Sequence, residues 1–299
     1  SRSAVSKDVR RSWGSPRLAA VAACVAVATA ASLNPSPPGH PRPAHSASVP
    51  GYALASTVLT LEGGLVGTQH LFHFTPLQLQ GALCRPPNQC RPVDYPAWPG
   101  EQFNAEGADL LAQAMNAPPA DPGPIVVYGH SQGGQVIYNV LRRWAANPQT
   151  APDPSRVSWV SIGNPENPYG GFAANRGPEP ALPADTAYHG IEVIRQYDGW
   201  ADWPDDQKNL LAVANALVGM TTVHSWYFNV DLNDPRNVHH TPAKPDGSPG
   251  NVEYVWVPNP VLPLIAGTGP LAPVLDKLLR PIIEAGYQPE IAYFECMHE

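Results

Sequence analysis

The stretch Pro124–Trp144, PIVVYGHSQGGQVIYNVLRRW, limits the possible folds of this chain more than any other part of it. Its first part, Ile125–Tyr128, is a short apolar run with β-branched residues, which is typical of a buried parallel strand. From Gln135 onward the apolar residues recur on one face with helical spacing. Between the two lies GHSQG, Gly129–Gly133, which fits the pattern G-x-S-x-G. A serine between a strand and a helix in this pattern predicts a nucleophile elbow.

Ser131 is the candidate nucleophile of this elbow. The sharp turn would lift its hydroxyl clear of the sheet, and the N-terminus of the following helix would favour developing negative charge. The alternative is a chance match of five residues in a chain with 25 glycines. The strand before the motif and the amphipathic helix after it favour the catalytic interpretation.

The rest of the chain alternates between strand and helix patterns. The expected strands are Ser56–Leu61, Gln89–Tyr95, Arg156–Ile162 and Gly190–Tyr197, and the expected helices are Phe103–Asn116 and Asn209–Met220. Such alternation calls for a central, mostly parallel sheet with helices on both faces. We therefore predict the α/β class and an α/β-hydrolase fold. Glu166–Ala187, rich in Gly, Pro and Asn, is expected to be an inserted surface loop near the site.

The acid and the base of an α/β-hydrolase follow the serine in that order. Two aspartates compete for the acid: Asp198 at the end of the strand Gly190–Tyr197, and Asp202 in the loop after it. A loop carboxylate can swing over the sheet edge to reach an imidazole, so Asp202 is favoured and Asp198 is the alternative. His224 follows the next expected helix, which is where the general base belongs.

Three other histidines are weaker candidates for the base. His239 and His240 lie in a polar loop with Pro, Asp and Gly that looks solvated. His130 lies inside the elbow itself and is expected to shape it. We expect neither a metal nor a cofactor, because no cluster of His, Cys, Asp and Glu has a ligand spacing.

The oxyanion hole of this architecture takes one backbone N–H from the residue after the serine, here Gln132. The second N–H comes from the loop that follows an early strand. Here that loop begins Glu62-Gly63-Gly64-Leu65, and Gly64 is the first candidate, with Leu65 next. The alternative for this glycine pair is an ordinary turn.

The N-terminal part differs in composition from the rest. Residues 1–50 contain a basic stretch, an apolar run at Leu18–Leu33 and a linker rich in Pro, Ser and His, which predict a secretory signal or a membrane anchor. Residues 51–299 are then the catalytic domain, exported and either secreted or anchored at the cell envelope. Cys84 and Cys90 bracket a short proline-rich step and are expected to form a local disulfide there.

The charge balance excludes one class of partner. The formal net charge is −7, and no basic stripe is present to neutralise phosphates, so we expect no nucleic acid partner. Val261–Tyr287 is a long apolar set interrupted by prolines. It is interpreted either as a lid or acyl-chain groove facing a lipid surface, or as a helix that packs on the sheet edge, the latter favoured for Val274–Ile283.

Several blocks, in one order, resemble the PE-PPE C-terminal domain family, the cutinase-like serine α/β-hydrolase domain of mycobacterial envelope proteins. The matching blocks are GHSQGG, GNPENPYGG (163–171), YDGWADWP (197–204), NLLAVANALVGM (209–220), VHSWYFNVDL (223–232) and IIEAGY (282–287). The resemblance covers roughly residues 54–287. It implies Ser131 as nucleophile, an aspartate of YDGWADWP as acid and His224 as base. No recognisable PE or PPE helical module precedes the domain, which resembles the stand-alone members.

The resemblance implies acyl-ester chemistry through an acyl-enzyme. Some stand-alone members look like acyltransferases that build acylated trehalose glycolipids. The expected partners are therefore a lipid acyl ester donor, water or a trehalose-like sugar hydroxyl as acceptor, and a membrane or envelope lipid surface. The triad and oxyanion hole serve both esterases and acyltransferases, so the motif does not separate them. The alternative is a catalytically silent envelope protein that uses the fold as a binding surface.

Overall fold

Seven strands form one sheet in the part of the chain that the computed structural model describes, which is residues 56–65, 67–116, 123–174, 182 and 185–287. The strands are β1 Thr57–Leu61, β2 Gln89–Pro92, β3 Ile125–His130, β4 Val157–Ile162, β5 Gly190–Arg195, β6 Val238–His240 and β7 Val252–Val257. Their order across the sheet is β2-β1-β3-β4-β5-β7-β6. All neighbours pair in parallel except β6, which runs antiparallel to β7 at one edge.

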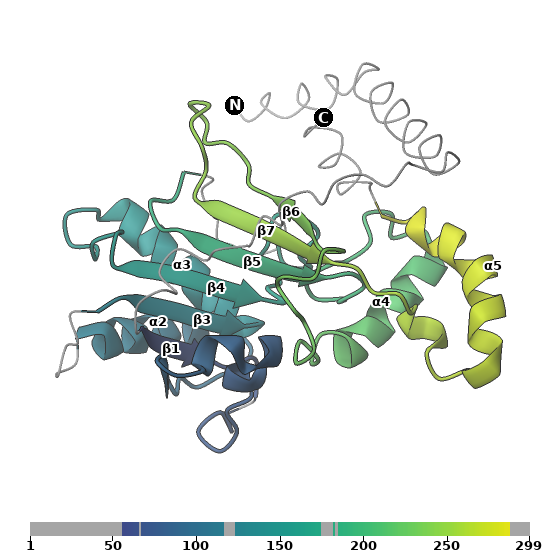
Figure 1. Cartoon of the computed structure of the whole chain (residues 1–299), viewed down its shortest axis with the longest axis horizontal. Helices are drawn as coiled ribbons and strands as arrows, with labels where there is room; N and C mark the ends of the chain where they lie inside the picture. Colours follow the sequence, from purple (N-terminus) through teal and green to yellow (C-terminus); the bar gives the residue numbers. More distant parts are fainter. Residues whose placement is uncertain (1–55, 66, 117–122, 175–181, 183–184, 288–299) are drawn as a thin grey trace, which may run out of the picture. The chain divides into compact units, whose positions relative to one another are not determined.

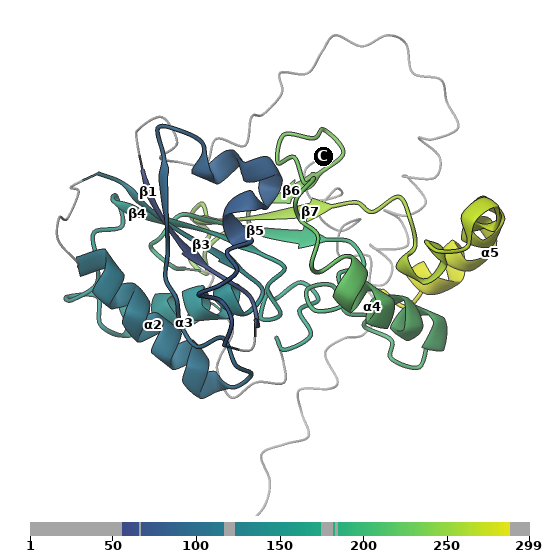
Figure 2. The same cartoon turned by 90° about the horizontal axis from the view of Figure 1, so that it is seen from below.

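The longer helices are α2 Glu101–Asn116, α3 Gln132–Ala146, α4 Leu210–Thr222 and α5 Ala272–Glu284. Short 3-10 turns occur at η1 Thr75–Leu77, η2 Leu79–Cys84, η3 Pro263–Ile265 and η4 Gly269–Leu271. Helices α2 and α3 lie on one face of the sheet, and η1 and η2 lie on the other (Figure 1 and Figure 2). Helices α4 and α5 lie together beyond the ends of the central strands in both views.

Two apolar cores follow from the alternation of side chains along the strands. Leu59 and Leu61 of β1 face α2 and α3 and join a core with Leu111 and Val136. Val58, one residue away, faces the opposite side, in a core with residues of η2. The sheet is therefore buried on both faces, as a mostly parallel sheet must be.

This arrangement confirms the predicted α/β-hydrolase fold, with a central, mostly parallel sheet flanked by helices. The expected strands and helices are all present, with ends shifted by a few residues. For example, Asn209 is not the first residue of α4 but its cap, because its side chain accepts a hydrogen bond from the N–H of Ala212 at 3.1 Å. The edge pair β6 and β7 was not predicted, and His239 and His240, expected in a solvated loop, lie on β6.

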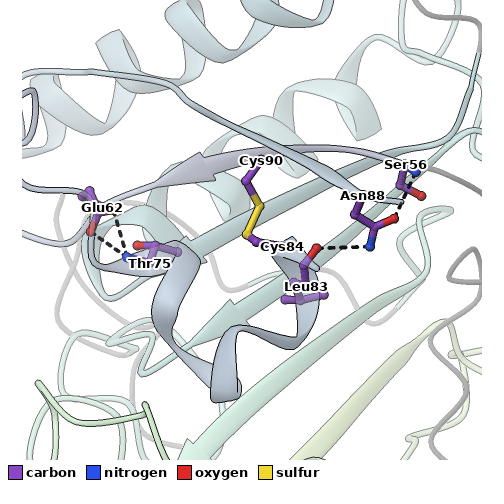
Figure 3. The surroundings of a disulfide bond; sticks show 7 residues. All are labelled: Ser56, Glu62, Thr75, Leu83, Cys84, Asn88 and Cys90. Carbon is purple, nitrogen blue, oxygen red and sulfur yellow. Dashed lines mark hydrogen bonds between the residues drawn. A yellow bond between two sulfur atoms is a disulfide. The ribbon is translucent and has the colours of Figure 1, made fainter. Parts of the chain in front are cut away.

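The disulfide between Cys84 and Cys90 is present and connects η2 to β2 (Figure 3). Nearby, the Asn88 side chain accepts from the N–H of Ser56 at 3.1 Å and donates to the carbonyl of Leu83 at 3.1 Å. These contacts tie the start of β1 to η2, which covers one face of the sheet. The first edge of the sheet is thus fixed both covalently and by hydrogen bonds.

Helix α5 packs on α4 and η3 through a small third core that includes Ala212, Ile265 and Ile283. None of the helices in the described ranges is both long and apolar enough to cross a membrane. The expected signal or anchor at residues 1–50 lies outside the described residues, and so do residues 175–181 and 183–184 of the expected surface loop Glu166–Ala187. The proposed division at residue 50 therefore stays a prediction.

Candidate active site

Ser131 sits in a sharp turn between β3 and α3. Its backbone has φ 57° and ψ −115°, a left-handed conformation that is costly for a residue with a side chain. The N–H of Ser131 donates to the carbonyl of Ile162 at 2.9 Å, and the first turn of α3 holds it from the other side. This geometry is that of a nucleophile elbow, with the hydroxyl at the carboxyl end of a central strand.

Two glycines make this turn possible because the backbones approach closely. A Cβ on Gly129 would lie 2.5 Å from the carbonyl group of Gly133. A Cβ on Gly133 would lie 2.3 Å from the carbonyl oxygen of Leu61 on β1. Real side chains do not tolerate such distances, so both glycines of G-x-S-x-G are required for α3 to pack against the sheet.

His224 lies directly after the end of α4 and points to the elbow. Its Nε2 is 2.7 Å from the Oγ of Ser131, and its Nδ1 is 2.8 and 2.9 Å from the two carboxylate oxygens of Asp198. The imidazole is mostly buried, and the Asp198 side chain is fully buried. The structure thus brings Ser131, His224 and Asp198 into one hydrogen-bonded chain. In that chain a base can take the serine proton while a carboxylate orients the imidazole.

The preference for Asp202 as the partner of His224 is corrected by this geometry. Strand β5 ends at Arg195, so Asp198 already lies in the turn, and it is Asp198 that reaches the imidazole. The Asp202 carboxylate instead folds back and accepts a hydrogen bond from the N–H of Tyr197 at 2.8 Å. Asp202 thus stabilises a turn, which is the role expected from the sequence for the aspartate that does not contact the histidine.

Tyr227 is a residue at this site that the sequence did not reveal. Its hydroxyl donates to Asp198 Oδ2 at 2.6 Å and accepts from the N–H of Arg195 at 3.1 Å, and its side chain is fully buried. Burial and the neighbouring carboxylate raise the pKa of Tyr227 well above its ordinary value, so it stays a donor. Only its place three residues after His224 hints at this role, and that spacing is not diagnostic.

His130 contacts the backbone of the candidate base His224. Its Nε2–H donates to the carbonyl oxygen of His224 at 2.9 Å, which leaves Nδ1 as the unprotonated nitrogen. Burial, followed by the proximity of His224, lowers the pKa of His130 to about 4. His130 is therefore neutral near pH 7 and holds the His224 backbone in place, in line with the shaping role expected from its position inside the elbow.

The two residues proposed to supply the oxyanion N–H groups, Gln132 and Gly64, lie close to each other. Gln132 is the first residue of α3, where a backbone N–H has no acceptor within the helix. A Cβ on Gly64 would be 3.6 Å from the Gln132 side-chain oxygen. The N–H of Leu65, the second candidate in this loop, donates to the carbonyl of Gly63 at 2.8 Å. Of the two, Gly64 therefore stays the better candidate.

The loop that carries Gly64 is held by a buried carboxyl. Both oxygens of Glu62 accept from the N–H of Thr75, at 2.9 and 3.2 Å (Figure 3). The carbonyl of Glu62 accepts from the hydroxyl of Tyr95 at 2.5 Å. Burial raises the pKa of Glu62, and the hydrogen bonds from Thr75 counteract this shift. These hydrogen bonds connect Glu62, just before the loop, to Thr75, after it, and to Tyr95.

A cavity of about 580 Å³ opens at Ser131. Its size falls within the range of small-molecule sites. Its apolar walls are formed by Leu65, Phe74, Pro99, Trp200, Trp226 and Phe228. The polar residues that line it are Glu62, Gln78, His130, Ser131, His224 and Ser225. An apolar chain in this cavity would place its polar end against the serine.

Two further expectations concern this region. Val261–Tyr287, one interpretation of which was a lid or acyl groove, contributes no residue to the cavity wall, and its helix α5 packs on α4 instead. Helix α5 therefore packs through residues such as the buried Ile283, but its main contacts are with α4, η3 and η4 and not with the sheet edge that was expected. Within the described ranges, no group of three or more His, Cys, Asp or Glu side chains is arranged to hold a metal ion.

Comparison with known protein families matches residues 81–288 to the PE-PPE domain. The match covers more than half of the chain. The chain belongs to the PE-PPE domain family. The elbow, His224 and both candidate acids lie inside the matched range.

Relatives of this PE-PPE chain are known in Mycobacterium tuberculosis. The esterase PE16 is 36% identical over 219 residues, which is 66% of this chain and 41% of that protein. The SL1278 acyltransferase Chp1 is 29% identical over 269 residues, 80% of this chain and 66% of that protein. The diacyltrehalose acyltransferase Chp2 is 28% identical, with 85% and 79% covered. The chain thus spans only about two fifths of PE16.

Among solved structures, a cutinase-like protein from Cryptococcus sp. matches the PE-PPE chain at 16% identity and a TM-score of 0.34. The match covers 58% of this chain and 92% of that protein. The fold assignment rests on the strand order and on the elbow between β3 and α3.

Proposed function

We propose that this chain is a serine enzyme that acts on acyl esters through a covalent acyl-enzyme. One observation carries the proposal: Ser131 Oγ lies 2.7 Å from His224 Nε2 in the lining of an apolar cavity, and His224 Nδ1 faces the buried Asp198. The relatives named esterase and acyltransferase support it, since both activities require acyl transfer from an ester.

In the first step His224 Nε2 takes the proton of Ser131 as Oγ attacks the ester carbonyl carbon. The carbonyl oxygen becomes an oxyanion, which the N–H groups of Gln132 and Gly64 would bind. The bond to the leaving alkoxide then breaks, and the imidazolium returns its proton to that oxygen. Asp198 stabilises the imidazolium throughout and keeps its proton on the correct nitrogen.

In the second step an acceptor hydroxyl gives its proton to His224 as its oxygen attacks the acyl carbon. The bond from that carbon to Ser131 Oγ then breaks, and the imidazolium returns the proton to Oγ. Water as acceptor gives an esterase, and a sugar hydroxyl gives an acyltransferase. We propose a lipid acyl group as the donor, because the cavity walls are apolar and aromatic. A trehalose-like sugar is the proposed alternative acceptor to water, supported by the name of the relative Chp2.

We further propose that the chain acts outside the cytoplasmic membrane. The disulfide between Cys84 and Cys90 supports this, because such bonds persist in oxidising compartments. In this proposal residues 1–50 serve as a secretory signal or anchor, and residues 51–299 form the catalytic domain. The proposed setting is the cell envelope, where lipid esters are available.

The test is mass spectrometry of the full 299-residue chain after reaction with a fluorophosphonate and, separately, with a lipid ester. Wild type is compared with Ser131→Ala and with Ser225→Ala, which removes another serine that lines the cavity. We expect an adduct on wild type and Ser225→Ala but not on Ser131→Ala. Faster discharge of the acyl group with trehalose than with water would identify an acyltransferase, and discharge by water alone an esterase.

An absence of any adduct on correctly folded wild-type chain would contradict the proposal. It would leave the alternative, an envelope protein that keeps the hydrolase fold as a binding surface. An adduct on both wild type and Ser131→Ala, but not on Ser225→Ala, would identify Ser225 as the nucleophile.

A further inference from the structure

The mouth of the cavity is surrounded by large apolar side chains that are exposed to solvent. Phe74 and Trp226 form part of the cavity wall, yet 42% and 52% of their surfaces are exposed. Trp200, which also lines the cavity, is 37% exposed. These three side chains therefore face the cavity with one side and solvent with the other.

The exposed apolar surface continues outward from the mouth along the chain before and within η1. The Phe72 ring stacks on the Phe74 ring with centroids 5.9 Å apart, and it is 49% exposed. Leu71 and Leu77 are 65% and 59% exposed. We name this surface the mouth rim; it consists of Leu71, Phe72, Phe74, Leu77, Trp200 and Trp226.

Hydrogen bonds fix the two main sides of the mouth rim to each other. The N–H groups of Leu79 and Gln80 donate to the carbonyls of Tyr227 and Phe228, both at 2.9 Å. The Gln78 side chain accepts from the N–H of Tyr227 at 2.8 Å. The segment after Phe74 and the segment after Trp226 are thus held together by three hydrogen bonds.

Large exposed apolar side chains gathered at the mouth of a cavity mark a site of interaction with another apolar body. The six rim side chains are uncharged, although His73 between Phe72 and Phe74 lies 2.8 Å from the Asp94 carboxylate. The chain as a whole carries a formal charge of −7, which would repel an anionic surface. The body that fits this rim is therefore apolar and without net negative charge. It must also allow an ester to reach Ser131.

We propose that the mouth rim seats the enzyme on the surface of an aggregated lipid without net charge, so that an acyl chain passes from the aggregate into the cavity without crossing water. The proposal rests on the proposed acyl-ester function and adds where the donor is bound. Apolar side chains that enter the acyl boundary of such an aggregate lose their contact with water, which stabilises binding.

A second exposed apolar face provides an internal control. Leu210 and Leu217 on α4 are 76% and 54% exposed, and neither lines the cavity. Leu71 and Phe72 also do not line it, although they lie next to Phe74. The double variants Leu71→Ser/Phe72→Ser and Leu210→Ser/Leu217→Ser therefore remove comparable exposed surface, at the rim in one case and on α4 in the other.

The experiment measures two properties of the full chain in wild type and both variants. The first is co-sedimentation with phosphatidylcholine vesicles, and with vesicles that also contain phosphatidylglycerol. The second is the hydrolysis of a short, soluble p-nitrophenyl ester and of a long-chain one above its critical micelle concentration. We expect the rim variant to lose about tenfold in vesicle binding and in the rate on the aggregated ester. We expect its rate on the soluble ester, and both properties of the α4 variant, to stay near wild type.

Three results would overturn the proposal. The first is unchanged vesicle binding and aggregated-ester rate in the rim variant. The second is an equal loss of both properties in the α4 variant. The third is that wild type forms a dimer but binds no vesicles, and that the rim variant is monomeric. In that case a second copy of the chain, and not a lipid aggregate, would cover the rim. If wild type hydrolyses neither ester and takes no covalent probe, the proposed function fails, while vesicle binding still tests the rim separately.

Discussion

The hydroxyl of Tyr227 donates a hydrogen bond of 2.6 Å to Oδ2 of Asp198, beneath the candidate base His224. The other oxygen, Oδ1, accepts from the N–H groups of Trp200 and Ala201 at 3.0 and 3.3 Å. The carboxylate thus has donors on all sides and is fully buried. Tyr227 fixes the orientation of Asp198 toward the imidazole, so we assign it as a positioning residue.

Replacement of Tyr227 by Phe tests this assignment. The variant removes the donor to Asp198 and leaves the Arg195 N–H without its acceptor. Because a hydrogen bond to a charged group contributes about 1.5–3 kcal/mol, we expect kcat on a soluble ester to fall about tenfold or more. KM should change little, since Tyr227 does not line the cavity.

The matched control is Tyr188→Phe, which removes another mostly buried hydroxyl, bonded to the carbonyl of Pro152. Its kcat should remain near wild type, while both variants lose stability in thermal unfolding. Equal kcat in the two variants would mean that the hydroxyl of Tyr227 has only a structural role.

The two candidate acids can be separated by one pair of substitutions. All the neighbours of Asp198 donate hydrogen bonds, so the amide of Asp198→Asn would bring an N–H against another donor. We expect kcat to fall roughly a thousandfold or more. Asp202→Asn keeps an oxygen that can accept from the N–H of Tyr197, so its kcat should stay within about threefold of wild type.

Steady-state kinetics with a soluble ester checks this pair, with circular dichroism to show that both variants fold. A large loss of kcat in Asp202→Asn, with the kcat of Asp198→Asn unchanged, would instead assign the acid to Asp202, as the sequence favoured.

The sequence predicted the central fold because its signals there are local. The apolar run of β3, the glycines of the elbow and the amphipathic α3 are adjacent in the chain, so their pattern can be read directly. The acid was harder, because the choice depended on where β5 ends. The strand was expected to reach Tyr197 but ends at Arg195, which turns Asp198 into a loop residue.

The parts that could not be predicted depend on contacts between distant segments. The edge strand β6 has only three residues and exists because it pairs with β7 across a long loop. The contact of Tyr227 with Asp198 and the exposure of Leu71 and Phe72 likewise follow from how separate loops meet. No periodic pattern in the chain reports such features.

His130 should make the protein less stable in acid. Its pKa is lowered to about 4 by burial, whereas in the unfolded chain it is about 6.5. Between these values the unfolded state binds a proton that the folded state does not, so stability falls as pH drops from about 6.5 toward 4. In His130→Gln the side chain at this position cannot titrate, and its amide N–H can still donate to the carbonyl of His224.

We expect the free energy of unfolding of His130→Gln, relative to wild type, to rise by about 2 kcal/mol between pH 7 and pH 4.5. Urea unfolding at several pH values measures this difference, in which the contributions of all other groups cancel. Parallel pH curves for the two proteins would show that His130 binds its proton equally in both states.

Glu192 on β5 should have the opposite effect, at higher pH. It is fully buried behind α3, where its Oε2 accepts from the Tyr138 hydroxyl at 2.7 Å and from the Asn164 amide at 3.3 Å. Burial raises the pKa of Glu192 to about 8, so the folded chain keeps a proton that the unfolded chain releases above about pH 4.5. Wild-type stability therefore decreases as pH rises from about 4.5 to 8, and acidification restores it.

Glu192→Gln keeps an oxygen for both donors but cannot ionise in either state. Its stability relative to wild type should increase by a few kcal/mol, to order of magnitude, between pH 5 and pH 8. The control Glu106→Gln changes an exposed carboxylate on α2 and should leave the wild-type pH dependence nearly unchanged. Urea unfolding at pH 5, 6.5 and 8 measures all three proteins. If Glu192→Gln follows the wild-type curve at every pH, Glu192 is ionised in the folded chain, and the buried network around Tyr138 must stabilise the carboxylate rather than the neutral acid.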